Sequence, residues 1–132
     1  MKIRVVVAGG TGKTGSAVTR VLLQQEDIEI VGAVGNKNAG RDLGEVLGLG
    51  ANGILIRSSL EEVLQHVQAD VLVDFTTPQT AGAHAIMAAS AGVRPVIGTT
   101  GIPQHELDKL SEICIEKGLA AAIIPNFSYG AM

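Results

Sequence analysis

The chain has 132 residues, of which 46% are hydrophobic, yet it contains only two Phe, one Tyr and no Trp. Ten basic and 13 acidic residues give a formal net charge of −3. The length fits one domain without room for a second, and the charge and scarce aromatics argue against a nucleic-acid partner. The single cysteine, Cys114, excludes an internal disulfide and a cysteine-rich metal site.

The N-terminal residues carry no signal-peptide cleavage pattern, and their apolar run is far too short to span a bilayer. We therefore expect a soluble cytoplasmic protein with no membrane partner.

The first half of the chain alternates apolar runs with helical patterns. Residues 3–8 and 28–34 are predicted as buried strands, and residues 13–25 as a helix with Val18, Val21 and Leu22 on one face. A polar, glycine-rich stretch from 35 to 53 follows, with one short helix over about 42–47.

The second half continues the alternation. Residues 54–56 form a short predicted strand, and Ser59 to Glu62 is a capping box that opens a helix reaching Val67. Strands are predicted over 71–74, 95–98 and 119–124. Thr77 and Pro78 open the helix that Gly92 closes, and Pro103 opens the last helix, which Gly118 ends.

Six strands with helices between most of them form a βαβ series without an internal repeat. Such a series predicts an α/β domain of Rossmann type, a doubly wound parallel sheet with helices on both faces. Ligands in this architecture bind beyond the carboxyl ends of the strands, where the topology reverses.

The turn after the first strand contains glycines at 9, 12 and 15, the spacing G-x-x-G-x-x-G. This variant of the dinucleotide fingerprint lets the backbone turn tightly, approach a pyrophosphate and pack helix against strand. A P-loop would need a glycine at Val7 and is excluded by spacing. A glycine turn without a ligand is the structural alternative.

The fingerprint usually has an acidic residue about twenty positions on, which binds the ribose hydroxyls. Gly35, Asn36 and Lys37 stand there instead, with Arg41 nearby. Lys37 and Arg41 are predicted to pair with a 2′-phosphate while Asn36 binds the sugar, so NADPH should bind at least as well as NADH. Two solvated loop charges are the other interpretation.

Three further loops follow predicted strands, at residues 74–78, 98–101 and 125–130. They are rich in small hydroxyl and amide groups, which can hydrogen-bond a carboxamide ring without bringing charge near a hydride.

The motifs in these loops resemble a known family. V-D-F-T-x-P, V-I-G-T-T-G and I-P-N-F-S-x-G follow G-x-x-G-[RK]-x-G in this order, and the whole set closely resembles the N-terminal domain of 4-hydroxy-tetrahydrodipicolinate reductase (dihydrodipicolinate reductase). The resemblance covers essentially all 132 residues. It implies reduction of a cyclic imine-type dicarboxylate with NADPH or NADH, on the diaminopimelate route to lysine.

The resemblance also implies cofactor-binding positions, although Thr14 stands where the family usually has Met. They are Gly9, Gly10, Thr11, Gly12, Lys13 and Thr14 for the pyrophosphate turn, Asn36 and Lys37 near the ribose, Phe75 and Thr76 beside the cofactor, and Gly98, Thr99, Thr100, Ile124, Pro125, Asn126 and Phe127 near the nicotinamide.

Members of the family continue into a substrate and tetramerisation domain with a histidine and lysine signature that these 132 residues lack. The resemblance thus implies no catalytic residue and no metal site in this chain, cofactor binding with little or no turnover, and a homotetramer only with the further domain. Two alternatives stay open: a free-standing dinucleotide sensor, and the cofactor domain of another amino-acid-pathway dehydrogenase.

The remaining polar candidates are interpreted structurally. His66 and His105 are expected on solvated helix faces, and His84 is expected to bond a nearby backbone carbonyl. Cys114 is expected as a small buried hydrophobe, and Asp74 as a residue that orders its own loop.

Overall fold

The computed structural model describes residues 2–124, which form a single six-stranded sheet. All strand pairs are parallel, in the order β3-β2-β1-β4-β5-β6. The elements in chain order are β1 (Ile3–Ala8), α1 (Lys13–Leu23), β2 (Ile28–Val34), α2 (Leu43–Val46), β3 (Ile56–Arg57), α3 (Leu60–His66), β4 (Val71–Asp74), α4 (Pro78–Ser90), β5 (Arg94–Ile97), α5 (Gln104–Lys117) and β6 (Ala122–Ile123). The predicted Rossmann-type fold is confirmed.

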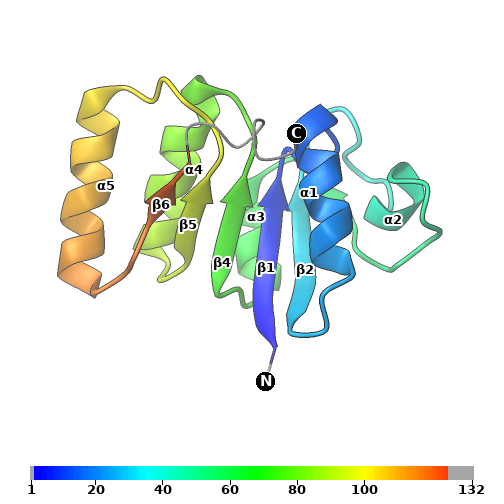
Figure 1. Ribbon diagram of the computed structural model, residues 1–132. Helices are drawn as coiled ribbons and strands as arrows, with labels where there is room; N and C mark the ends of the chain where they lie inside the picture. Colours follow the sequence, from blue (N-terminus) through cyan, green and yellow to red (C-terminus); the bar gives the residue numbers. More distant parts are fainter. Residues whose placement is uncertain (1, 125–132) are drawn as a thin grey trace.

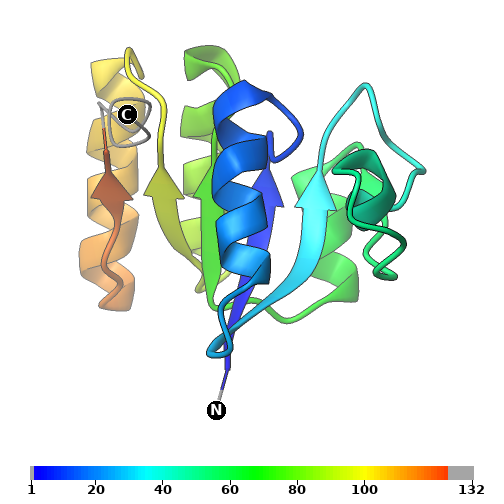
Figure 2. The same cartoon turned by 45° about the vertical axis from the view of Figure 1, so that its right-hand side comes forward.

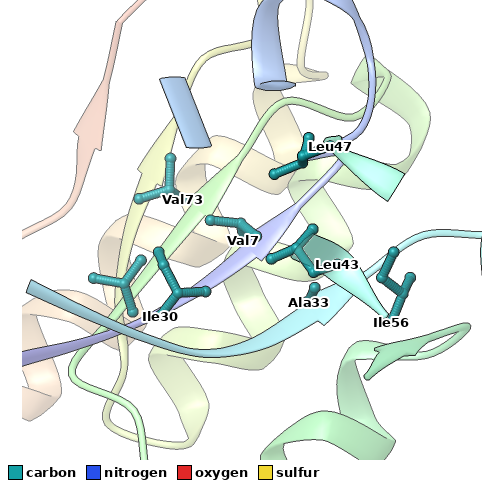
Figure 3. Close-up of a cluster of buried hydrophobic side chains, with 8 residues drawn as sticks. Val7, Ile30, Ala33, Leu43, Leu47, Ile56 and Val73 are labelled. Atoms are coloured by element: carbon teal, nitrogen blue, oxygen red, sulfur yellow. The ribbon is translucent and has the colours of Figure 1, made fainter. Parts of the chain in front are cut away.

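Helices cover both faces of this sheet, with α1 and α2 on one side and α3, α4 and α5 on the other (Figures 1 and 2). The alternation of side chains along β1 explains why both faces are buried. Val5 and Val7 enter the core beneath α1 and α2, whereas Val6 and Ala8 enter the core beneath α3 and α4. Figure 3 shows Val7 in the first of these clusters, beside Leu43. A third cluster joins α4, α5 and Ile97.

A bulge in β2 adjusts this alternation. Val5 pairs with Ile30 but Val6 pairs with Gly32, so β2 holds one extra residue, Val31, against β1. A Cβ at Gly32 would lie 2.6 Å from Val63 Cγ1, so α3 packs directly over the glycine.

Several predicted boundaries differ from those of the structure. The first helix ends at Leu23 rather than at residue 25, and the strand expected over 54–56 is Ile56–Arg57. The strand expected over 95–98 is Arg94–Ile97, and the strand expected over 119–124 is reduced to Ala122–Ile123. The last strand is short because it lies at the sheet edge and pairs only with Val96 and Ile97.

The predicted apolar face of α1 was wrong in part, because Val21 is 56% exposed. The residues of α1 that are fully buried are Gly15 and Thr19, four positions apart. The Thr19 hydroxyl donates to the Gly15 carbonyl at 2.7 Å, which satisfies its polar group in the core. Small residues at this spacing bring the helix close to the sheet, and a search for large apolar residues misses such a face.

The predicted start of α3 and the predicted end of α5 agree with the structure. Ser59 accepts the Glu62 backbone N–H at 3.2 Å, as the capping box predicts, and Gly118 ends α5 in the left-handed conformation with φ +66°. Cys114 is buried, as expected. Among the helices within residues 2–124, none is long and apolar enough to cross a membrane.

Candidate dinucleotide-binding site

At two glycines around the turn between β1 and α1, Gly9 and Gly15, neighbouring backbone atoms occupy the place of a side chain. Gly9 has φ +73°, and a Cβ there would lie 2.9 Å from the Phe75 carbonyl carbon. A Cβ at Gly15 would collide with the Gly9 carbonyl oxygen. The turn is therefore pressed against both the loop after β4 and the first turn of α1, and only glycine fits at either position.

Gly12 differs from these two glycines because it faces open space. It is exposed, and the nearest atom to a Cβ would be the Gly9 carbonyl oxygen at 3.5 Å, an ordinary contact. It occupies the N-cap of α1 without a side-chain cap. By helix geometry, the first N–H groups of α1 have no acceptor inside the helix, so they remain available to an anion.

A cleft of about 490 Å³ opens above this turn at the carboxyl edge of the sheet. It lies between the loops that follow β1, β2, β3 and β4, and thus at the point where the strand order reverses direction. Its lining consists of Gly9, Thr11, Gly12, Val34, Gly35, Asn36, Lys37, Asn38, Ser58, Thr76, Thr77, Thr80 and His84.

The cleft brings together part of the predicted set. Gly9, Thr11, Gly12, Asn36, Lys37 and Thr76 line it. Gly10 is buried beneath the turn, and Lys13 and Thr14 lie on the first turn of α1 outside the lining.

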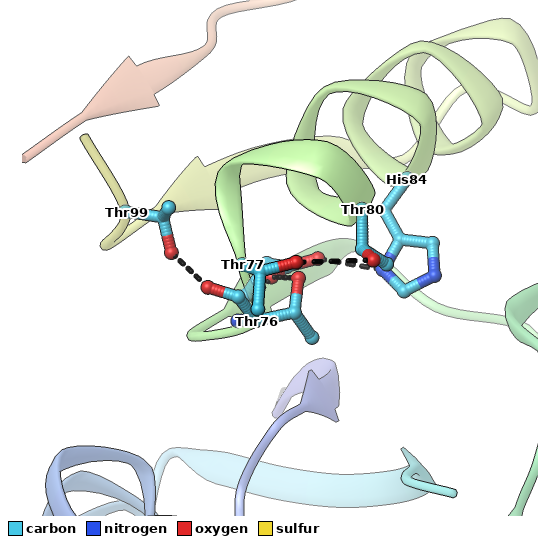
Figure 4. A network of polar contacts seen from close by, with 6 residues as sticks. Thr76, Thr77, Thr80, His84 and Thr99 are labelled. Atoms are coloured by element: carbon cyan, nitrogen blue, oxygen red, sulfur yellow. Dashed lines mark hydrogen bonds and ion pairs between the residues drawn. The ribbon is translucent and has the colours of Figure 1, made fainter. Parts of the chain in front are cut away.

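A second group of predicted residues lies further along the same edge, beside β5 and β6. Gly98, Thr99 and Thr100 follow β5, and the Ile124 N–H donates to the Ile97 carbonyl at 2.8 Å. The Thr99 hydroxyl donates to the Thr76 carbonyl oxygen, which ties this group to the cleft (Figure 4). Pro125, Asn126 and Phe127 lie outside the described residues.

The part of the cleft formed by the loop after β2 contains a cation and no anion. Among the described residues 2–124, no Asp or Glu lines the cleft. Lys37 is the only Lys or Arg among these lining residues. Arg41 is exposed and outside the lining, with its Nη1 at 3.5 Å from Asn38 Oδ1. The structure thus places Lys37, but not Arg41, on the cleft wall.

Sequence reasoning missed several lining residues. Asn38 donates from Nδ2 to the Thr11 hydroxyl at 3.3 Å and so connects the loop after β2 to the glycine turn. Ser58, Thr77 and Thr80 also lie on the wall. For Ser58 and Thr77, the position just beyond a strand end was the available signal, because side chains there reach the carboxyl edge of the sheet. Thr80 lies on the first turn of α4.

His84 is the other missed residue, and its predicted backbone partner was wrong. Its Nδ1 lies 2.7 Å from Asp74 Oδ2 (Figure 4), because α4 places it over the end of β4. Asp74 also orders its own loop, as expected, since its Oδ1 accepts the Thr76 backbone N–H at 2.7 Å and the Thr76 hydroxyl at 2.5 Å.

Comparison with known proteins identifies the family of this chain. Residues 3–127 match the family described as dihydrodipicolinate reductase, N-terminus. The chain belongs to this family.

The relatives are substantially longer than this chain. The 4-hydroxy-tetrahydrodipicolinate reductase of Moorella thermoacetica is 45% identical over 130 residues, which are 98% of this chain and 49% of that protein. The enzyme of the same name from Desulfitobacterium hafniense (strain DSM 10664 / DCB-2) is 42% identical over 132 residues, with 99% and 49% covered. The chain therefore spans about half the length of these curated relatives.

A solved structure of the family has the same fold. The dipicolinate-bound dihydrodipicolinate reductase from Paenisporosarcina sp. TG-14 superposes with a TM-score of 0.83 at 30% identity. The match covers 99% of this chain and 50% of that one. This family membership weighs against the alternative of a cofactor domain from another amino-acid-pathway dehydrogenase.

Proposed function

We propose that this chain binds NAD(P)H as the cofactor-binding half of a 4-hydroxy-tetrahydrodipicolinate reductase. The observation that carries the proposal is the open cleft above Gly12, where a tight glycine turn meets the exposed start of α1 in a chain of this family.

The shape of the site fits a dinucleotide. The pyrophosphate would lie over Gly12. Neighbouring backbone covers Gly9 and Gly15, whereas Gly12 is the one of these three glycines that a ligand can approach closely. The adenosine half would lie toward Asn36 and Lys37, on the β2 side of the turn. The nicotinamide would lie toward Gly98 to Thr100, near β5.

The reduced nicotinamide supplies the hydride in this reaction. The work of the chain is to hold and orient that ring, with Thr99 fixed by its hydrogen bond to the Thr76 carbonyl. The resemblance implies that proton delivery and binding of the dicarboxylate substrate belong to sequence beyond these 132 residues. We therefore expect the 132-residue chain to bind the cofactor with little or no turnover, and tetramers to need the further sequence.

The substitution Gly12→Ala tests the site. Its backbone has φ −72° and ψ 176°, which alanine adopts readily, and the added methyl has no close neighbour in the protein. The methyl would nevertheless occupy the space of the pyrophosphate. We expect affinity for NADPH and NADH to fall at least about tenfold with an unchanged Tm, since a displaced phosphate loses one or more charge-assisted hydrogen bonds.

Binding is measured by titrating the reduced dinucleotides and following nicotinamide fluorescence. Ser111→Ala on the exposed face of α5 is the control. Equal affinities for the wild type and Gly12→Ala would reject this placement of the pyrophosphate. Failure of the wild type to bind either dinucleotide would reject the proposed function.

A further inference from the structure

The pair formed by Asp74 and His84 lies at the cleft and has no role in the proposal above. The Asp74 side chain is fully buried and that of His84 is 14% exposed. Burial of a charged side chain is unfavourable unless hydrogen bonds satisfy it, and three bonds satisfy Asp74. Such an arrangement holds the imidazole in one orientation.

The bonding of Asp74 also determines which ring nitrogen remains for other partners. An ionised carboxylate only accepts hydrogen bonds, and the two groups on Oδ1, the backbone N–H and the hydroxyl of Thr76, are donors. His84 Nδ1 is then the donor to Oδ2. In the neutral ring, Nε2 consequently has a lone pair that can accept a hydrogen bond.

The position of His84 identifies the part of a dinucleotide that it would meet. Together with Thr80, one helical turn earlier on α4, it lines the same cleft as Ser58 and the residues after β2. Gly98, Thr99 and Thr100 do not line this cleft. If the ribose lies at Asn36 and the pyrophosphate at Gly12, the space between α4 and Ser58 remains for the base.

We infer that His84 recognises the adenine base, with Nε2 accepting a hydrogen bond from the 6-amino group and Asp74 fixing the ring. The inference rests on the proposed dinucleotide binding. An amino group donates where the 6-oxo group of hypoxanthine only accepts, so this contact discriminates between the two bases.

The test compares NADPH with its hypoxanthine analogue, in which an oxygen replaces the 6-amino group. The wild-type chain should bind NADPH about fivefold more tightly than the analogue, as expected for one hydrogen bond. His84→Asn keeps an amide N–H that can donate to Asp74 but has no atom in the place of Nε2. This variant should bind both dinucleotides with equal affinity while its Tm stays close to that of the wild type.

His105→Asn, on the exposed start of α5, is the matched control and should keep the wild-type preference. Equal affinity of the wild type for the two dinucleotides would overturn the inference, as would a preference that persists in His84→Asn. Either result leaves the proposed function standing, because both require that the dinucleotides bind. If His84→Asn does not fold, His84→Ala, which also has no atom in the place of Nε2, should lose the preference for NADPH over the analogue in the same way.

Discussion

Asp74 illustrates how a single buried residue organises the loop between β4 and α4. Its side chain is completely inaccessible, and both carboxylate oxygens accept hydrogen bonds. Removing it would leave the Thr76 N–H and the His84 ring without their acceptor, and buried unpaired donors are costly. The residue therefore acts on the cleft through the two neighbours that it holds.

We predict that Lys37 determines the preference for NADPH over NADH. Substitution to Gln should weaken NADPH binding about tenfold, because a charge-assisted bond to the 2′-phosphate is lost. NADH lacks that phosphate, so its affinity should stay within about twofold. The measurement is a fluorescence titration of both cofactors, with Lys109→Gln on exposed α5 as the charge-matched control.

Equal loss of affinity for both cofactors in Lys37→Gln would contradict a specific phosphate contact. NADH binding at least about tenfold tighter than NADPH in the wild type would contradict the predicted preference itself.

At the scale of elements, the segment around α2 is held by hydrogen bonds to Asp42 as well as by Leu43 and Leu47 in the core. Asp42 caps α2 by accepting the Glu45 N–H at 3.1 Å, and its oxygens also accept the N–H groups of Asn52 and Gly53. A Cβ at Gly44 would collide with the Gly50 carbonyl oxygen, so the loop returns directly over the helix. One carboxylate thus joins the start of α2 to the end of the glycine-rich segment at Asn52 and Gly53.

This arrangement predicts a pH dependence. Desolvation by burial raises the pKa of Asp42, but the backbone hydrogen bonds from Asn52, Glu45, Gly53 and Gly44 outweigh it and lower the pKa below the usual 3.8. A lowered pKa in the folded state stabilises the fold above the unfolded value of about 3.8, and this contribution is lost as pH falls through the folded value. Asp42→Asn should therefore lower Tm at pH 7 and make the decline of Tm below about pH 4 shallower.

The measurement is thermal unfolding by circular dichroism from pH 7 to pH 2, with Asp27→Asn at an exposed turn as the control. The hydrogen bonds from the Arg4 side chain likewise lower the pKa of Asp70, so wild type and variant share that part of the acid decline. A Tm profile for Asp42→Asn that parallels the wild type at every pH would contradict the prediction.

At the scale of the whole molecule, the sheet lies between two helical layers (Figures 1 and 2). The cleft opens at the carboxyl edge of that sheet. The neighbouring strands β1 and β4 are central, and the connections after them leave toward opposite faces. The turn at Gly9 packs directly on the backbone after β4. The geometry of the site therefore depends on the packing of these two central strands.

The substitution Leu72→Ala tests how much the central strands contribute to the free energy of unfolding. It is fully buried in β4 beneath α3 and α4, so Leu72→Ala should reduce the free energy of unfolding by about 2–5 kcal/mol through lost burial and a residual cavity. Urea denaturation checks this value. Ile115→Ala, on α5 where the side chain is 79% exposed, should change it by less than about 0.5 kcal/mol. Comparable losses in the two variants would contradict the described core.

Much of this protein follows from local signals in the sequence. The alternation of apolar runs and helical spacing predicts a parallel, doubly wound sheet, and the glycine spacing predicts the turn after β1. These features depend on residues close together in the chain, through turn conformation, capping and side-chain periodicity. The terminal strand was overestimated because an apolar run does not show how many residues find a pairing partner.

Other features depended on how distant elements pack, and only the tertiary structure decided them. His84 meets Asp74 instead of a backbone carbonyl because α4 crosses over the end of β4, a relation that no local pattern encodes. Val21 faces outward because the small face of α1, Gly15 and Thr19, is the one against the sheet. The sequence by itself determined the order of the elements and the turn chemistry, whereas packing across the sheet selected which side chains share the cleft, because those contacts join residues far apart in the chain.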